Sequence, residues 1–171
     1  DAMVDQVARD PALFTFMSTC APDAPTHIGD ARIVLEAQAD TRYDILIIDA
    51  YSSDAVPVHL TTHEAMELYR DRLTENGILA LHISNRYYQL ERPVARSAAE
   101  MGMAAYWQNF KGDREDPTNS GSVVAILARD ASVLAPLTAS GQWTALETDG
   151  GQIWTDDYAN LLSILRGGNG G

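Results

Sequence analysis

Hydrophobic residues along this chain occur in two alternating patterns, continuous runs and helical spacing. The strongest run, residues 43–49, is rich in β-branched side chains and ends in an acid. Such a run is typical of a strand buried on both faces of a parallel sheet. Residues 78–83 form a second run of this kind, and residues 26–28, 104–110 and 123–128 predict shorter strands.

Helical patterns separate most of these runs. Residues 61–64 fit a capping box with Thr61 as the N-cap and Glu64 at the third helical position, so a helix is predicted to begin there. Gly77, after Asn76, would end this helix in a left-handed conformation. Apolar spacing predicts further helices over residues 2–9, 33–39 and 92–101, and a last one after Trp154, capped by Thr155 or Asp156, with Tyr158, Leu161, Leu162 and Leu165 on one face.

The order of these elements is strand, helix, strand, helix, strand, strand. Alternation of this kind predicts a layered α/β fold with a mostly parallel sheet, and the last two strands, joined without a helix, predict an antiparallel edge. The polar segment 111–120 would be the loop between them. A length of 171 residues predicts one domain, which we place at residues 1–166, and the Gly-rich residues 167–171 predict a disordered tail.

Charge and cysteine content narrow the classes of function. The 12 basic and 24 acidic residues give a net charge of −12, which excludes a nucleic-acid binder and docking on anionic lipid but permits a cationic small-molecule ligand. Cys20 is the single cysteine, so neither an intramolecular disulfide nor a cysteine zinc site is possible. No apolar run approaches the roughly 20 residues of a membrane span, and no signal peptide opens the chain. Because Asp1 falls at the edge of a predicted helix, we expect a segment of a longer protein.

Acidic residues stand where an open α/β sheet binds its ligands, beyond the carboxyl ends of the strands. Asp49 and Asp30 each follow a predicted strand, and the loop after Asp49 supplies Tyr51, Ser52 and Asp54. Two carboxylates beside a cleft suit an amine substrate, because one can hold the ammonium group and the other can accept a proton from the attacking nitrogen. The alternative is that Asp49 is a turn or cap residue and Asp54 a solvated loop acid.

Histidines are the other candidates. His82 lies in the predicted strand 78–83 and is followed by the polar residues 84–86, so it is either a ligand-binding residue or a buried, hydrogen-bonded histidine. His59 and His63 are four residues apart, but His59 precedes the predicted helix and no third ligand follows at a known spacing, so we expect no metal site.

Two adjacent acids near the C-terminus complete the set of candidates. Asp156 and Asp157 either line the same cleft or stabilise the N-terminus of the last predicted helix, and we favour the helix role.

Three segments together resemble the spermidine synthase-like family, in its branch of long, often membrane-fused bacterial proteins. They are residues 43–60 (YDILIIDAYSSDAVPVHL), 77–87 (GILALHISNRY) and 154–162 (WTDDYANLL), and the likeness extends over residues 1–165. The resemblance implies the C-terminal portion of a Rossmann-like, class I methyltransferase-type domain. The Gly-rich loop and the first strands of that domain would precede Asp1.

The resemblance also implies a reaction, the transfer of an aminopropyl group from decarboxylated S-adenosylmethionine to an amine such as putrescine, without a metal. By resemblance Asp49 would help deprotonate the amine and Asp54 would shape the gate loop. By resemblance Asp30 would contact the adenine amino group of the donor. We place the donor site at Asp30, Ala31, Asp49 and Ala50, and the acceptor site at Tyr51, Ser52, Asp54 and His82. The implied location is the cytoplasm, either free or as the soluble domain of a membrane-anchored parent.

Strands that precede Asp1 would leave the sheet open beside residues 43–49. We therefore expect either a homo-oligomer or a rearrangement of residues 1–40, and no activity from the isolated segment. Two other functions stay open, because a fold does not determine a reaction. They are an S-adenosylmethionine-dependent methyltransferase and a non-catalytic polyamine- or nucleotide-binding module.

Overall fold

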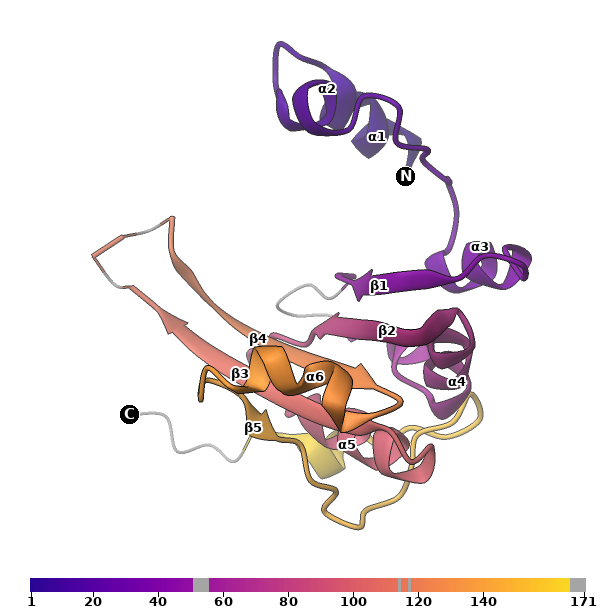
Figure 1. Ribbon diagram of the computed structural model, residues 1–171, viewed down its shortest axis with the longest axis vertical. Helices are drawn as coiled ribbons and strands as arrows, with labels where there is room; N and C mark the ends of the chain where they lie inside the picture. Colours follow the sequence, from indigo (N-terminus) through magenta and orange to yellow (C-terminus); the bar gives the residue numbers. More distant parts are fainter. Residues whose placement is uncertain (51–55, 114, 117, 167–171) are drawn as a thin grey trace. The chain divides into compact units, whose positions relative to one another are not determined.

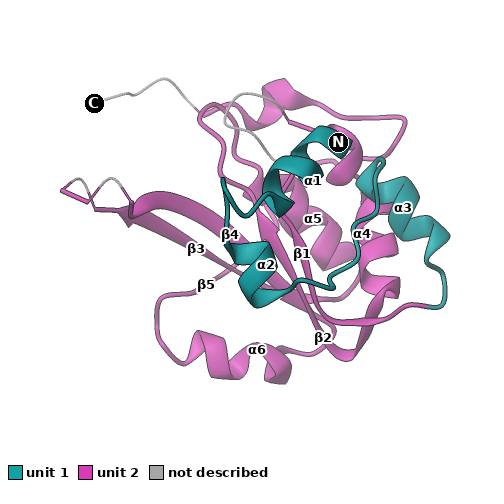
Figure 2. Cartoon of the chain, turned by 90° about the horizontal axis from the view of Figure 1, so that it is seen from above, with its two compact units in different colours: residues 1–40 teal, residues 41–171 magenta. Residues whose placement is uncertain are grey.

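The computed structural model describes residues 1–50, 56–113, 115–116 and 118–166. The chain divides into two compact units, residues 1–40 and residues 41–171, which Figure 2 shows in different colours. The predicted tail 167–171 lies outside the described residues. The single domain expected over residues 1–166 stays a prediction.

The first unit is helical. Helix α1 (Ala2–Arg9) confirms the first predicted helix, α3 (Ala31–Ala37) begins and ends two residues before the predicted 33–39, and α2 (Phe16–Cys20) was not predicted. The strand predicted at residues 26–28 is wrong. The Thr26 hydroxyl instead accepts a 2.5 Å hydrogen bond from the Arg9 guanidinium, and the described part of this unit holds no strand with which the segment could pair.

The second unit is built on a five-stranded sheet with the order β1-β2-β4-β3-β5 in the described residues (Figure 1). Its strands are β1 (Tyr43–Ile48), β2 (Leu73–His82), β3 (Ala104–Gly112), β4 (Ser120–Ala128) and β5 (Thr144–Ala145). β1 and β2 are parallel, whereas the pairs β2–β4, β3–β4 and β3–β5 are antiparallel. The predicted α/β, Rossmann-like class is confirmed, with an antiparallel part that extends over three strand pairs. Residues at both ends of the predicted loop 111–120 belong to the β3–β4 hairpin.

Strand β1 is not buried on both faces, contrary to the prediction. Ile45 and Ile47 are 63% and 65% exposed, and only Ile48 at the end of the strand is fully buried. The reason is the position of β1 at the edge of the sheet, where among the described residues β2 is its one neighbour. An apolar run therefore correctly predicted a strand, but not its environment.

Helix α4 (His63–Asp71) begins one residue later than predicted and is shorter. Thr62, not Thr61, is the N-cap, and its hydroxyl accepts a hydrogen bond from the amide of Ala65 at 3.4 Å. Gly77 does not end the helix but lies inside β2. A Cβ on Gly77 would lie 2.8 Å from the carbonyl oxygen of Tyr43, so glycine is needed there for close approach of the two strands.

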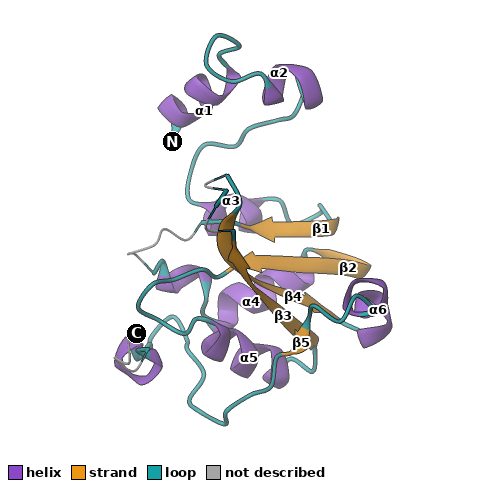
Figure 3. Ribbon diagram, turned by 90° about the vertical axis from the view of Figure 1, so that its left-hand side faces the viewer, coloured by secondary structure: helices purple, strands orange, loops and turns teal. Residues whose placement is uncertain are grey.

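Helices cover both faces of the sheet (Figures 2 and 3). α4 and α5 (Glu91–Glu100) lie on one face, and α6 (Ala131–Thr138) lies on the other. α5 confirms the helix predicted over 92–101. α6 was missed because Pro136 interrupts its pattern, yet Leu134 on this helix is fully buried against β4.

The helix predicted after Trp154 is wrong. Trp154 is fully buried, but the chain then turns and forms a single 3-10 turn, Leu161–Ile164, with Asn160 as its N-cap. Of its apolar residues Ile164 is buried, whereas Leu162 is 78% exposed, so the apparent helical face is not a packed one. A second 3-10 turn, Val58–Leu60, precedes α4.

Candidate active site at the carboxyl ends of β1 and β2

Asp49 and His82 meet where the two parallel strands end. Asp49 directly follows β1, and His82 is the last residue of β2. The carboxyl ends of adjacent parallel strands lie at the same edge of a sheet, which brings the two side chains together. His82 Nδ1 lies 2.7 Å from Asp49 Oδ1. The carboxylate is 67% exposed and the imidazole 33% exposed, so a ligand can reach both.

A serine and a backbone amide extend this pair into a hydrogen-bonded chain. His82 Nε2 lies 2.7 Å from the Ser84 hydroxyl oxygen, which accepts a 2.7 Å hydrogen bond from the amide of Val123 on β4. A carboxylate oxygen only accepts, so the assigned tautomer carries its proton on Nδ1, which donates to Asp49. In that neutral tautomer Nε2 accepts from the Ser84 hydroxyl. The β2–β4 pairing thus holds the orientation of the Asp49 carboxylate.

A pocket of about 410 Å³ opens beside His82, between the end of β2 and the β3–β4 hairpin. Its walls come from three segments far apart in the sequence: His82 and residues 84–86, residues 109–111, and residues 121–123. Its volume falls in the range of roughly 300–1,000 Å³ that small-molecule sites occupy. Asp49 is connected to this pocket through His82.

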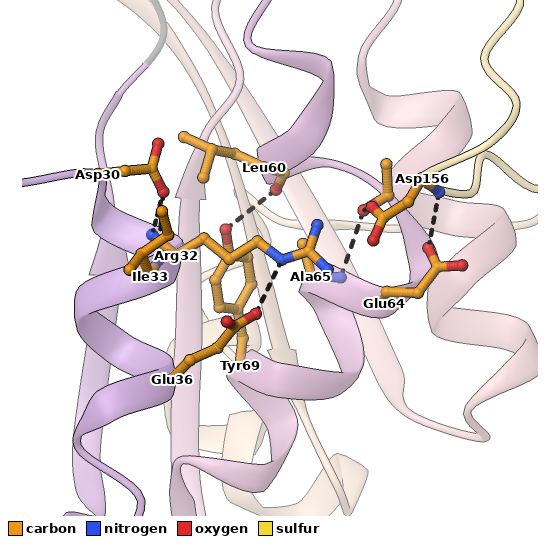
Figure 4. Close-up of polar contacts among 10 residues, drawn as sticks. Asp30, Arg32, Ile33, Glu36, Leu60, Glu64, Ala65, Tyr69 and Asp156 are labelled. Atoms are coloured by element: carbon orange, nitrogen blue, oxygen red, sulfur yellow. Dashed lines mark hydrogen bonds and ion pairs between the residues drawn. The ribbon is translucent and has the colours of Figure 1, made fainter.

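The other residues predicted to bind the donor or the acceptor belong to the first unit, follow Asp49, or lie outside the described residues. Asp30 is the N-cap of α3, where Oδ1 accepts hydrogen bonds from the amides of Arg32 (3.0 Å) and Ile33 (3.2 Å) (Figure 4). Ala31 is the first residue of that helix, and Ala50 follows Asp49. A role for these residues with the donor stays a prediction. Tyr51, Ser52 and Asp54 lie outside the described residues.

Asp156 stabilises a helix other than the one predicted. It accepts a 2.8 Å hydrogen bond from the hydroxyl of Thr62, the N-cap of α4, and its amide donates to Glu64 at 3.1 Å (Figure 4). The predicted partner helix does not form, so the negative charge lies at the N-terminus of α4 instead. Asp157 is exposed. These contacts fasten the C-terminal segment to α4 and make Asp156 structural in this unit.

The histidine pair shows no metal-binding arrangement in the part of the chain that the structure describes. His63 Nε2 lies 3.9 Å from Glu67, and no group of three or more potential ligands gathers anywhere among the described residues. Within those same residues, no helix has both the length and the apolar character needed to span a membrane.

Two features of the candidate site were not predicted from the sequence. One is the direct contact between His82 and Asp49, although Asp49 was predicted to end one strand and His82 to lie near the end of another. The other is the position of Lys111, which falls in the predicted loop 111–120. In the structure Lys111 belongs to β3, and the extended β3–β4 hairpin places it at the pocket with Arg86.

Comparison with known proteins points to one class. No family model matches the chain. A polyamine aminopropyltransferase from Vibrio vulnificus (strain CMCP6) is 26% identical over 117 residues, which cover 67% of this chain and 37% of that protein. The crystal structure of a probable spermidine synthase from Corynebacterium glutamicum ATCC 13032 matches with a TM-score of 0.58 at 17% identity, over 94% of this chain and 63% of that one.

The fold is that of a Rossmann-like, methyltransferase-type α/β protein. Within that class, the chain has a spermidine synthase-like fold. It spans little more than a third of the curated relative that it matches and less than two thirds of the solved structure.

Proposed function

We propose that this chain is the C-terminal, acceptor-side part of an aminopropyltransferase. The enzyme would transfer an aminopropyl group from decarboxylated S-adenosylmethionine to a polyamine or another amine, putrescine being the simplest case. The observation that carries the proposal is the exposed Asp49 carboxylate held by His82 beside a pocket at the carboxyl ends of β1 and β2. The 26% identity to a polyamine aminopropyltransferase supports the same reaction.

The reaction is a displacement at carbon. The amine nitrogen attacks the carbon next to the donor sulfonium, a C–N bond forms, and the C–S bond breaks with its electron pair going to sulfur. Methylthioadenosine leaves as a neutral thioether, and the new ammonium group loses one proton. Asp49 would accept that proton from the nitrogen as it attacks, and would align the lone pair with the carbon beforehand.

His82 would act as a positioning residue in this scheme. Its Nδ1–H donates to one carboxylate oxygen of Asp49 and leaves the outer side of the carboxylate, which is largely exposed, to the amine. A hydrogen bond to an ionised acceptor is short and strong, so it fixes the direction in which Asp49 points.

Binding of the donor nucleotide needs more than these residues. The sequence contains no Gly-rich nucleotide loop of the GxGxxG type. Asp30 already caps α3 through one of its oxygens. We therefore propose that the isolated chain is inactive and that the longer protein is the enzyme.

Replacement of Asp49 tests the proposal in that longer protein. Asp49→Asn is expected to lower kcat for aminopropyl transfer by about 10²–10⁴, as loss of a general base does. The matched control is Glu100→Gln, which removes one exposed negative charge at the end of α5 and should leave kcat unchanged. An unchanged rate in Asp49→Asn would refute the assignment. Methyl transfer from intact S-adenosylmethionine in place of aminopropyl transfer would identify a methyltransferase, and ligand binding without any product a binding module.

A further inference from the structure

The pocket beside His82 has an unexpected charge. Two cationic side chains, Arg86 and Lys111, line it, and no acidic side chain is among the described residues that form its walls. The whole protein carries a net charge of −12, and Lys111 is its one lysine. A pocket for a simple diamine would be expected to present acids at both ends, because both ends of a diamine are cationic at neutral pH.

The two cations are not neutralised by neighbours in the described structure. Arg86 lies over the ring of Tyr87, 5.8 Å from its centre, and forms no ion pair among the described residues. Lys111 forms none either, within the same residues. In contrast, Arg9, Arg70, Arg92, Arg96 and Arg166 each have a carboxylate within 4 Å. The pocket therefore holds positive charge that is available to a ligand.

An amide donor adds to this charge. Asn85, between Ser84 and Arg86, accepts hydrogen bonds from the amides of Tyr87 and Tyr88 at 2.9 Å through Oδ1. The buried Nδ2 of the same side chain has no acceptor among the described residues. A buried donor without a partner is unfavourable, so an anionic oxygen near Asn85 would be stabilised.

We propose that the pocket binds the carboxylate of an acceptor that carries both an amine and a carboxylate. This inference rests on the proposed function, and it replaces the plain diamine with an amino acid that bears a side-chain amine. The amine would lie at Asp49 and His82, and the carboxylate at Arg86 and Lys111. Phe110 and Val123, which also line the pocket, would contact the hydrocarbon chain between the two groups.

A pair of matched probes tests the proposal on this chain without any donor. L-Ornithine is putrescine that carries one additional carboxylate, so the two ligands differ only in the group under test. Calorimetric titration should give at least about tenfold tighter binding for ornithine, the gain expected from one charge-assisted hydrogen bond. Ornithine should also shift the backbone amide resonances of Phe110, Lys111 and Val123 in the NMR spectrum of the labelled protein. Equal or tighter binding of putrescine, or no binding of ornithine, would overturn the proposal.

Substitutions in the pocket test where the carboxylate of ornithine binds. Arg86→Gln and Lys111→Gln, combined, should remove the advantage of ornithine and leave the affinity for putrescine equal or higher. Both side chains are exposed, so the fold should persist, and the dispersion of the same NMR spectrum checks this. The control Arg129→Gln removes one charge outside the pocket, where the guanidinium donates to the carbonyl of Arg70, and should preserve the advantage. An advantage that survives in the double variant contradicts the proposed position.

The carboxylate of intact S-adenosylmethionine is the other possible source of the same chemistry. If intact S-adenosylmethionine displaces ornithine and its decarboxylated form does not, Arg86 and Lys111 bind the carboxylate of the donor. The proposal of an amino-acid acceptor is then overturned. The test is separate from that of the proposed function. Ornithine binding without aminopropyl transfer in the longer protein would refute the reaction and not the pocket, whereas efficient transfer to putrescine in preference to ornithine would refute only the pocket.

Discussion

His82 Nδ1 lies 2.7 Å from Asp49 Oδ1, across the gap between two parallel strands that end side by side. Residues 33 positions apart in the sequence are thus joined by one hydrogen bond at an exposed edge of the sheet. The pair connects an exposed carboxylate to the β2–β4 part of the sheet through Ser84 and Val123. The first two predictions below follow from this connection.

In the proposed aminopropyltransferase, His82 should affect the rate through the orientation of Asp49. His82→Ala is expected to lower kcat by about tenfold to a hundredfold, because a hydrogen bond to a charged group is worth about 1.5–3 kcal/mol. His82→Asn places an amide donor near the position of Nδ1 and should restore most of the rate. Equal losses in the alanine and asparagine variants would mean that the imidazole is not a positioning residue but contacts the substrate itself.

Ser84 should contribute to stability as well as to the site. Ser84→Ala leaves the amide of Val123 without its acceptor, so we expect a loss of about 1–2 kcal/mol in the free energy of unfolding. Ser84→Thr keeps the hydroxyl and should lose less. Urea unfolding followed by circular dichroism measures both, and a Ser84→Ala midpoint equal to that of the unaltered chain would contradict the prediction.

Arg96 and Asp149 form a two-point ion pair in the second unit. Arg96 is 5% exposed, its Nε and Nη2 donate to the two oxygens of Asp149 at 2.6 and 2.7 Å, and Nη1 donates to the carbonyl of Gln152. The hydrogen bonds from Arg96 hold the pKa of Asp149 far below its ordinary value, against the opposing effect of partial burial. They likewise raise the pKa of Arg96.

The stability that this pair contributes should depend on pH with a definite sign. A carboxylate with a lowered pKa in the folded state stabilises the fold fully above the pKa of an unfolded aspartate, about 3.9, and loses that effect as the pH falls below it. Asp149→Asn leaves the Arg96 charge without its partner and should cost about 2 kcal/mol at pH 7, less than a fully buried pair because Asp149 is 36% exposed. Between pH 4 and pH 2 the difference in the free energy of unfolding between Asp149→Asn and the unaltered protein should shrink, because Asp149 is increasingly protonated and loses its pairing with Arg96.

The control for this measurement is Asp157→Asn, which alters an exposed residue of the same C-terminal segment. It should leave the free energy of unfolding unchanged. A gap between Asp149→Asn and the unaltered protein that widens as the pH falls would show that the ion pair is not its cause.

The open edge of β1 should lead to self-association. Ile45 and Ile47 are largely exposed on a strand that, among the described residues, has a neighbour on one side only. Such an edge pairs readily with another chain, and lysines on it oppose pairing. Light scattering of the chain should therefore give a dimer or larger species, and Ile45→Lys with Ile47→Lys should shift it toward monomer. The control Leu162→Lys alters an apolar residue that is 78% exposed elsewhere in the unit and should have no effect. A monomer at all concentrations would contradict the prediction.

Local patterns were sufficient for the elements whose residues interact with near neighbours. The apolar run before Asp49 identified β1, and the spacing of Val94, Ala95 and Ala98 identified α5. The motifs around β1, β2 and Trp154 also indicated the spermidine synthase-like fold by their resemblance to that family.

The tertiary structure decided whatever depends on residues distant in sequence. Gly77 resembles a helix end, but the carbonyl of Tyr43 leaves room only for glycine within β2. The helical spacing after Trp154 did not produce a helix, because the segment is held instead by Thr62 and Glu64 on α4.

The same distinction applies to the candidate site. By itself the sequence predicted that Asp49 ends one strand and that His82 lies near the end of another, since apolar runs and the polar residues beside them are local features. Only the tertiary structure decided that the two side chains share a hydrogen bond and that Arg86 and Lys111 line one pocket. The physical reason is that register and hairpin length, which set these distances, arise from pairing between strands and not from the pattern along any one of them.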